Sequence, residues 1–125
     1  MGKKGRVLGW VVIGLLLCLP VSEAKATVHQ FACGGGSTIQ SYINNPAVVS
    51  GDTIKVTGGQ CNENVDVNKS GLTIDGSNAA IINGTDSNQP TVKIRVGGTT
   101  VRNFLSIQGG DHGISIQTCS PTIYI

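Results

Sequence analysis

From residue 51 to residue 117 the chain alternates apolar and polar positions with a period of two. In TVKIRV, Val92, Ile94 and Val96 alternate with Lys93 and Arg95. This period places successive side chains on opposite faces of a β-strand, so it predicts strands with one aliphatic and one polar face. Glycine, asparagine, aspartate and serine fill the gaps and favour turns. The predicted strands are DTIKV (52–56), ENVDV (63–67), LTIDG (72–76), AAIIN (79–83), TVKIRV (91–96), TTVRNF (99–104), LSIQGG (105–110) and GISIQ (113–117).

Ahead of the strands, CGGGSTIQSYINNPAVV has the pattern of a short helix. Ile39 and Ile43 are four positions apart and share one helical face. Ser37 and Gln40 fit the S-x-x-Q capping box, and Pro46 is expected to end the helix. A helix this short needs an apolar surface to pack on, which the strands would supply.

Related segments recur along the chain. Ile74 in GLTIDG corresponds to Val101 in GTTVRN at a spacing of about 27, and Ile94 corresponds to Ile116 at about 22. One such repeat cannot bury its aliphatic face alone, but stacked coils can bury a continuous column. An antiparallel sandwich or jelly roll is the competing architecture. Its tight Asn-Gly hairpins are mostly missing, since only Asn83-Gly84 would serve.

The segment SGDTIKVTGGQCNENVDVNKSGLTIDG resembles the start of secreted members of the right-handed parallel β-helix, or pectin-lyase-like, superfamily. The resemblance covers about residues 33–117. It implies an all-β fold of three parallel sheets, about three coils between residues 52 and 117, and a helix that closes the N-terminal end of the aliphatic column. It implies little about activity, because one fold carries many functions.

Residues 1–26 have the organisation of a secretory signal peptide. Lys3, Lys4 and Arg6 precede an apolar run of about 15 residues, shorter than the about 20 needed to span a membrane. Ala24-Lys25-Ala26 supplies a small-x-small cleavage pattern. We therefore expect a signal peptide at 1–26, a cap segment with a short helix at 27–50 and β-helix repeats at 51–125. The mature chain would be extracellular or periplasmic, without a membrane span.

Removing residues 1–26 changes the charge of the chain. Four of the nine basic residues and one of the seven acidic residues leave with them, so about one net negative charge remains. There is no basic tract and little aromatic content, and so no basis for nucleic-acid binding.

Three cysteines remain after residues 1–26 are removed. Export favours a disulfide, and an odd count leaves one thiol over. We expect Cys33–Cys61, because both lie in the ordered N-terminal half, whereas Cys119 lies near an apparently unfinished end. No CxxC pair suggests a zinc site.

The C-terminal TCSPTIYI begins another strand without a terminal cap. The last coil would then expose strand edges and aliphatic side chains. We expect either that the chain is the front of a longer protein or that a partner covers its end, and we favour the fragment.

The segment DHGISIQ is similar to the GHGISIG signature of polygalacturonases, in which the histidine supports catalytic aspartates. His112 to Ile116 match that signature. The carboxylate pairs one and two coils earlier and the later basic RIK are missing, and Asp111 alone cannot provide the two carboxyl groups that glycoside hydrolysis needs. The competing interpretation is a solvated corner of Asp111 and His112, with Gly113 providing a permissive backbone.

Polysaccharide lyases of the same superfamily hold Ca²⁺ with clustered carboxylates and use a basic residue to abstract a proton. Here the acids are single and lie on different turns, at Asp66, Asp75, Asp86 and Asp111. Lys93, Arg95 and Arg102 are candidates for an outward basic strip that binds uronates. The competing interpretation is that Lys93 and Arg95 pair with Asp66 of the preceding coil.

Asparagines recur near strand ends, where turn formation and stacked amide ladders are the expected roles: Asn62, Asn64, Asn68, Asn78, Asn83 and Asn103. Asn68-Lys69-Ser70 and Asn83-Gly84-Thr85 are also glycosylation sequons, relevant in a eukaryotic host. His29 lies beside the predicted cleavage site and is expected to have no partner.

Together these features predict a secreted, non-catalytic β-helix module that contacts acidic polysaccharide or a cell-surface component. The candidate ligand-binding residues are Lys93, Arg95, Arg102, Asp111 and His112. No cofactor is expected, except Ca²⁺ under the alternative, a polysaccharide lyase or pectin-degrading hydrolase whose catalytic coils are missing from this chain. A degraded gene product without activity is a third interpretation.

Overall fold

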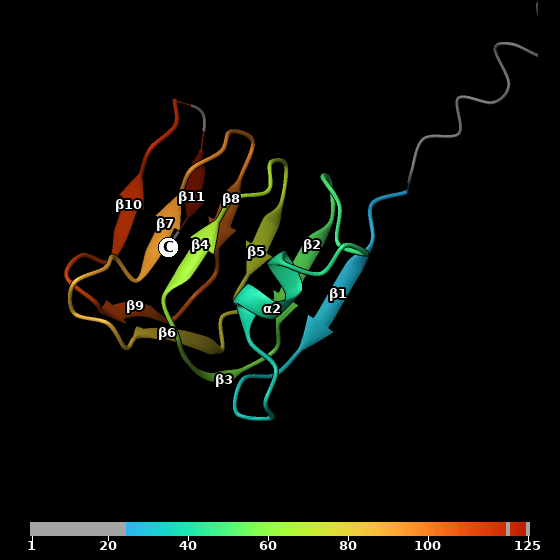
Figure 1. Ribbon diagram of the computed structural model, residues 1–125. Helices are drawn as coiled ribbons and strands as arrows, with labels where there is room; N and C mark the ends of the chain where they lie inside the picture. Colours follow the sequence, from blue (N-terminus) through green and yellow to red (C-terminus); the bar gives the residue numbers. More distant parts are fainter. Residues whose placement is uncertain (1–24, 120, 125) are drawn as a thin grey trace, which may run out of the picture.

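The computed structural model describes residues 25–119 and 121–124, which wind into a parallel β-solenoid (Figure 1). The predicted signal peptide lies outside these residues except for Lys25 and Ala26. The elements are β1 (Val28–Phe31), α2 (Ile39–Ile43), β2 (Thr53–Val56), β3 (Gly59–Asn62), β4 (Val65–Val67), β5 (Thr73–Asp75), β6 (Ala80–Gly84), β7 (Val92–Ile94), β8 (Thr100–Arg102), β9 (Ser106–Gly109), β10 (Ile114–Ile116) and β11 (Thr122–Tyr124).

The strands form three sheets, and each coil contributes one strand to each. Sheet A has the order β1-β2-β5-β8-β11, sheet B the order β3-β6-β9, and sheet C the order β4-β7-β10. All the pairs between these strands are parallel. Three complete coils are therefore stacked, with β1 before them and β11 after them (Figure 1). The predicted parallel β-helix is confirmed and the antiparallel alternative is wrong.

The register of the coils is the one that the sequence repeats predict. Ile74 pairs with Val101, and Ile94 pairs with Ile116. The first pair belongs to a longer row in sheet A, in which Ile54 precedes Ile74 and Ile123 follows Val101. Ile54, Ile74 and Val101 are fully buried. Each such aliphatic side chain gains about 1.5–3 kcal/mol when it leaves water.

The end of the stack that follows β10 is less well covered than its middle. Ile116 faces the column in register with buried Ile94, yet 48% of its surface is exposed. The predicted exposure of aliphatic side chains in the last coil is confirmed for this residue.

The opposite end is covered by α2, whose Ile39 and Ile43 are fully buried. The predicted helix is confirmed, but the predicted capping pair is wrong. The N-cap is Thr38, which has an extended backbone (φ −125°) and exchanges hydrogen bonds with Ser41. Ile39 is thereby the first helical residue, and its side chain is fully buried.

Gln40 completes the edge of sheet C instead of capping the helix. The backbone N–H of Asp66 donates to Gln40 Oε1 at 2.7 Å, and Gln40 Nε2 donates to the backbone oxygen of Asp66 at 3.2 Å. The side-chain amide thus occupies the place of a neighbouring strand. It satisfies two backbone groups of β4 at an edge that would otherwise be open to pairing.

Strand β1 was not predicted, because VHQF is short and lies beside the signal sequence. The expectation that His29 lacks a partner is wrong, since its Nε2 lies 2.9 Å from Asp52 Oδ2. Asp52 is almost fully buried and also accepts the backbone N–H groups of Thr27 and Val49. Hydrogen bonds from Val49, Thr27 and His29 lower the pKa of Asp52 from 3.8 to about 2, against the opposing effect of burial.

The predicted Cys33–Cys61 disulfide is confirmed, with its Cα atoms 5.1 Å apart. It ties the start of the cap segment to β3 across 28 residues. Closing a loop of this length stabilises a fold by about 3 kcal/mol in the chain-entropy model. Cys119 is a free, exposed thiol.

Neighbouring isoleucines in β6 offer a matched test of the inward and outward faces. Ile82 is buried in the column, whereas Ile81 points outward and is only half-buried. We expect Ile82→Ala to lower the free energy of unfolding in urea by about 2–5 kcal/mol, because it leaves a cavity. Ile81→Ala should cost less than about half as much. Equal costs would contradict the assignment of the two faces.

The ionisation of Asp52 makes the free energy of unfolding depend on pH. Because its pKa is lowered on folding, its contribution is fully present above its ordinary pKa of 3.8 and is lost as the pH falls toward about 2. We expect Asp52→Asn to lower the urea midpoint at pH 7. The gap to the wild type should narrow between about pH 4 and about pH 2. A gap that stays constant over that range would show that the Asp52 charge does not stabilise the fold.

Candidate functional site

A hollow of about 110 Å³ lies on the outer face of sheet C. Strands β4 and β7 form its floor, and the loop between β6 and β7 supplies one wall. It brings together two of the predicted ligand-binding residues, Lys93 and Arg95, with Asp66 of the preceding coil. The full lining is Asn64, Val65, Asp66, Gln89, Pro90, Lys93 and Arg95.

The strand pattern fixes where the two cations lie. Val92 and Ile94 point into the column and are buried, so Lys93 and Arg95 face outward. Lys93 lies in β7 and Arg95 directly follows it, so the Cα atoms of the two residues are about 7 Å apart on an extended backbone. Asp66 is in register with Lys93 across the β4–β7 ladder.

The charges in the hollow are partly paired. Arg95 Nε donates to Asp66 Oδ1 at 2.8 Å, and Lys93 Nζ donates to Gln89 Oε1 at 3.2 Å. The predicted pairing across the coils is therefore confirmed for Arg95 and Asp66. The Arg95 bond uses Nε alone, and its two Nη groups make no hydrogen bond to another described residue. The hollow thus keeps donors that can meet an anion.

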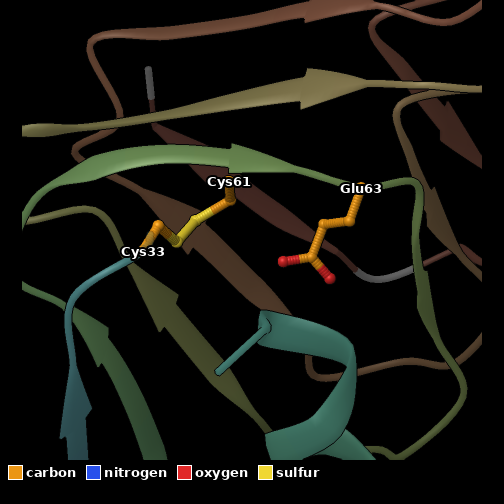
Figure 2. Close-up of side chains that lie close together, drawn as sticks. All are labelled: Cys33, Cys61 and Glu63. Atoms are coloured by element: carbon orange, nitrogen blue, oxygen red, sulfur yellow. A yellow bond between two sulfur atoms is a disulfide. The ribbon is translucent and has the colours of Figure 1, made fainter. Parts of the chain in front are cut away.

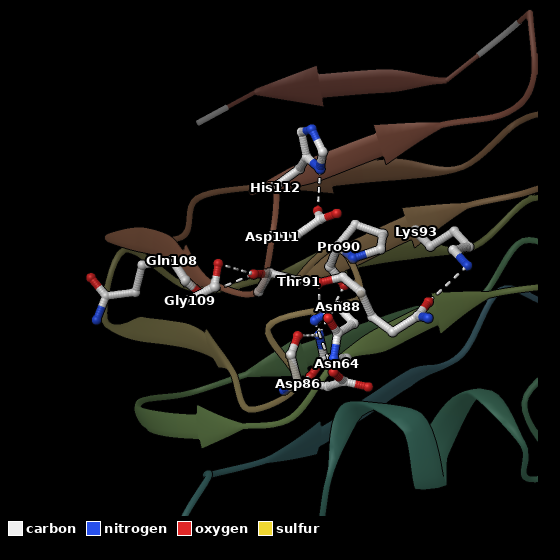
Figure 3. A network of polar contacts seen from close by, with 11 residues as sticks. Asn64, Asp86, Asn88, Pro90, Thr91, Lys93, Gln108, Gly109, Asp111 and His112 are labelled. Atoms are coloured by element: carbon white, nitrogen blue, oxygen red, sulfur yellow. Dashed lines mark hydrogen bonds and ion pairs between the residues drawn. The ribbon is translucent and has the colours of Figure 1, made fainter.

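Asn64 shapes the wall of the hollow (Figure 3). Its Oδ1 accepts the backbone N–H groups of Thr85 and Asp86 at 2.9 and 2.8 Å. Its Nδ2 donates to the backbone oxygens of Asp86, Gln89 and Pro90 at 3.0–3.3 Å. One side chain from the preceding coil thereby replaces the backbone pairing that the loop lacks. The loop is held over β7, with Gln89 within reach of Lys93.

The chemistry of the hollow suits an anion that also carries hydroxyl groups. It offers two cations, one carboxylate and two side-chain amides, and no aromatic ring. Arg95 is 49% exposed, so solvent and salt screen its charge, and each ionic contact is worth up to about 1 kcal/mol.

Arg102 does not join Lys93 and Arg95, and the predicted continuous basic strip is wrong. The chain turns from sheet C into sheet A between β7 and β8, which carries Arg102 to another face. There its Nε donates to Asp75 Oδ2 at 2.9 Å. Burial opposes ionisation of Asp75, but hydrogen bonds from Ser77, Asn103 and Arg102 outweigh it and lower the pKa of Asp75.

Asp111 and His112 lie in the turn between β9 and β10, exposed and hydrogen-bonded to each other (Figure 3). Their backbones hold the turn in place: the N–H of Asp111 donates to the oxygen of Gln89, and the N–H of Thr91 donates to the oxygen of His112. The solvated-corner interpretation describes this geometry, and a ligand-binding role for the two residues stays a prediction.

The residues that give that turn its left-handed backbone are not the one predicted from the sequence, Gly113. Gly109 and Gly110 have positive φ values of 75° and 58°, and Gly113 does not. A side chain at Gly109 would collide with the backbone of Gly84 in the coil below. The turn therefore requires glycine two residues ahead of Asp111, where the backbones of neighbouring coils lie too close for a side chain.

Among the described residues, one group of three metal-type ligands gathers within 4.8 Å: Cys33, Cys61 and Glu63 (Figure 2). The two sulfurs are joined to each other. The Glu63 carboxylate accepts the backbone N–H groups of Ile39 and Gln40 at 2.8 and 3.0 Å, at the start of α2. Burial raises the pKa of Glu63, and those two hydrogen bonds oppose the rise. The group therefore holds the cap in place, and it is not the acid set considered for Ca²⁺.

A stretch of 79 residues, 63% of this chain, is 37% identical to a cell surface glycoprotein of Methanothermus fervidus. The match spans 13% of that protein, so it concerns one segment of a much longer chain. No family model matches the sequence, and no solved structure matches it. Membership of the pectin-lyase-like superfamily stays a prediction. No helix in the described part of the chain is long and apolar enough to cross a membrane.

The sequence pattern predicts turn formation or a stacked amide ladder for Asn64, and it predicts no role for Gln89 in the site. Both contribute through contacts between coils, 25 residues apart along the chain. The repeat spacing of about 27 residues between Ile74 and Val101 could have indicated this contact, because residues separated by about one repeat lie side by side in neighbouring coils.

Asn64→Ala tests the wall of the hollow. We expect faster hydrogen exchange at the amides of Thr85 and Asp86, and a loss of about 1–3 kcal/mol in stability, because several backbone groups lose their partner. Asn88→Ala is the matched control, since that side chain makes no hydrogen bond to a described residue. Unchanged protection in the Asn64 variant would show that the loop does not depend on this side chain.

Proposed function

We propose that this chain is an extracellular, non-catalytic β-solenoid module that contacts acidic polysaccharide at a cell surface. Two observations support the extracellular setting: the disulfide, which is typical of oxidising compartments, and the segment shared with a cell surface glycoprotein. The signal peptide predicted from the sequence agrees with this setting. The observation that carries the choice of ligand is the hollow on sheet C, where Lys93 and Arg95 lie beside two amides.

The charge of the hollow favours an acidic polymer over a neutral one. Neutral sugars are commonly bound by stacking on aromatic side chains, and no aromatic side chain lines this hollow. A uronate carboxylate can instead meet the free Nη groups of Arg95, whose fork matches a carboxylate. Lys93 adds a second positive charge, and the Gln89 side-chain amide can donate to a sugar hydroxyl through Nε2. The Asn64 amide is already bonded to the loop and serves to hold the wall in place.

We leave out catalysis because two of the four acids considered for a lyase are held in ion pairs with arginines. Asp66 is paired with Arg95, and Asp75 with Arg102. Hydrolysis requires two carboxyl groups facing one bond at separations of about 5–9.5 Å. The alternative, a polysaccharide lyase or pectin-degrading hydrolase, would need catalytic coils that are missing from this chain.

Binding of the purified chain to polygalacturonate at low ionic strength tests the proposal. We expect Lys93→Ala and Arg95→Ala each to weaken binding by up to about fivefold, since an exposed ionic contact is worth up to about 1 kcal/mol. Added salt should weaken wild-type binding, and dextran, a neutral polymer, should not bind.

Lys55→Ala is the matched control, because it removes the same charge from sheet A and should leave binding unchanged. Equal loss in the Lys55 variant would mean that net charge, and not the hollow, binds the polymer. Formation of unsaturated product during the assay would favour the lyase instead.

A further inference from the structure

The two glycosylation sequons of the chain lie in opposite structural settings. Asn68-Lys69-Ser70 forms the turn between β4 and β5, whereas Asn83-Gly84-Thr85 begins inside β6. Attachment of an N-linked glycan requires both the Asn amide and the hydroxyl of the third residue to reach the transferring enzyme. The setting of each sequon therefore decides whether the folded chain can accept a glycan.

In the first sequon, both the Asn amide and the hydroxyl of the third residue are accessible. Asn68 and Ser70 are exposed, and neither side chain makes a hydrogen bond to another described residue. Lys69 holds the turn from the other side, where its Nζ donates to the backbone oxygens of Asn45 and Val48 at 3.0 and 2.6 Å. The turn is thus anchored through its middle residue, and its two sequon side chains face solvent.

The second sequon is held at both positions. Strand β6 is the middle strand of sheet B, paired with β3 on one side and β9 on the other. Asn83 Nδ2 donates to Asn62 Oδ1 at 3.1 Å, which confirms one rung of the predicted amide ladder. The backbone N–H of Thr85 donates to Asn64 Oδ1, and its hydroxyl donates to the same oxygen at 3.4 Å. Thr85 itself is exposed, whereas Asn83 is half-buried inside the paired strand, so freeing the whole sequon would require the end of β6 to break its pairing with β3 and β9.

From this contrast we propose that Asn68 is an N-glycan attachment site of the folded protein and that Asn83 is not. The donor is a lipid-linked oligosaccharide. Asn68 Nδ2 forms a bond to the anomeric carbon of its first sugar and loses one proton, the bond from that carbon to the lipid phosphate breaks, and the lipid phosphate leaves. No oxidant or reductant takes part.

A glycan at this position would border the hollow on sheet C. The backbone N–H of Arg95 donates to the oxygen of Val67, so Asn68 flanks Arg95 on the outer face. The glycan would narrow the approach to Arg95 from that side. The two proposals remain separable, because Asn68→Gln removes the attachment site and leaves Lys93 and Arg95 in place.

The test exposes the folded, disulfide-bonded protein to a purified oligosaccharyltransferase and its lipid-linked donor, with intact mass and peptide mapping as the measurement. The enzyme is one first shown to modify synthetic peptides that contain each sequon. We expect one glycan per chain, at Asn68, in the wild type and in Asn83→Gln. The fraction of chains that carry a glycan should fall at least tenfold in Asn68→Gln and in Ser70→Ala. It should not change in Thr85→Ala.

Modification of Asn83 in the folded chain, or equal modification of both sites, would overturn the proposal. So would a folded chain that takes no glycan under conditions in which the Asn68 peptide is fully modified. Urea-unfolded protein is the internal control, because both sequons should then become acceptors.

Discussion

Contact between aliphatic side chains of successive coils is the interaction on which this fold depends. One coil contributes a single strand to each sheet, so it can neither pair its own backbone nor cover its own isoleucines and valines. Stacking solves both problems together, because the ladder that satisfies the backbone of β5 also places Ile74 between Ile54 and Val101. Stability therefore grows with the number of neighbouring coils, and a coil with a neighbour on one side only needs another element to cover its open face.

The cap segment answers this problem at one end. Helix α2 covers the column with Ile39 and Ile43, Gln40 substitutes for a missing strand, and Glu63 meets the free N–H groups at the start of the helix. The Cys33–Cys61 disulfide fastens the segment to β3. The contacts of Gln40 and Glu63 and the disulfide each join residues more than 20 positions apart, so the cap is a tertiary structure that forms only when the first coil is in place.

The difference between inward and outward positions also explains how much of the molecule could be predicted from the sequence. Inward positions obey a simple rule, and the pairing of Ile74 with Val101 follows from the repeat spacing alone. Outward positions vary freely, but alternation within one strand still places Lys93 and Arg95 on the same face. The prediction that Arg102 joins them is wrong, because the chain turns into another sheet before Arg102. Such a turn does not change the alternation of apolar and polar residues. The partner of His29 escaped prediction for a similar reason, since Asp52 reaches it only after β1 pairs with β2. Side-chain contacts at corners depend on where neighbouring coils lie, and a local pattern does not contain that information.

Nuclear Overhauser contacts between β2, β5 and β8 in the folded protein test the central claim most directly. The stacked-coil account predicts parallel amide-to-Hα contacts in the order Ile54, Ile74, Val101, together with methyl contacts along that row. Short Hα-to-Hα contacts between these strands, which only antiparallel pairs produce, would contradict it, and so would methyl contacts that skip the middle coil.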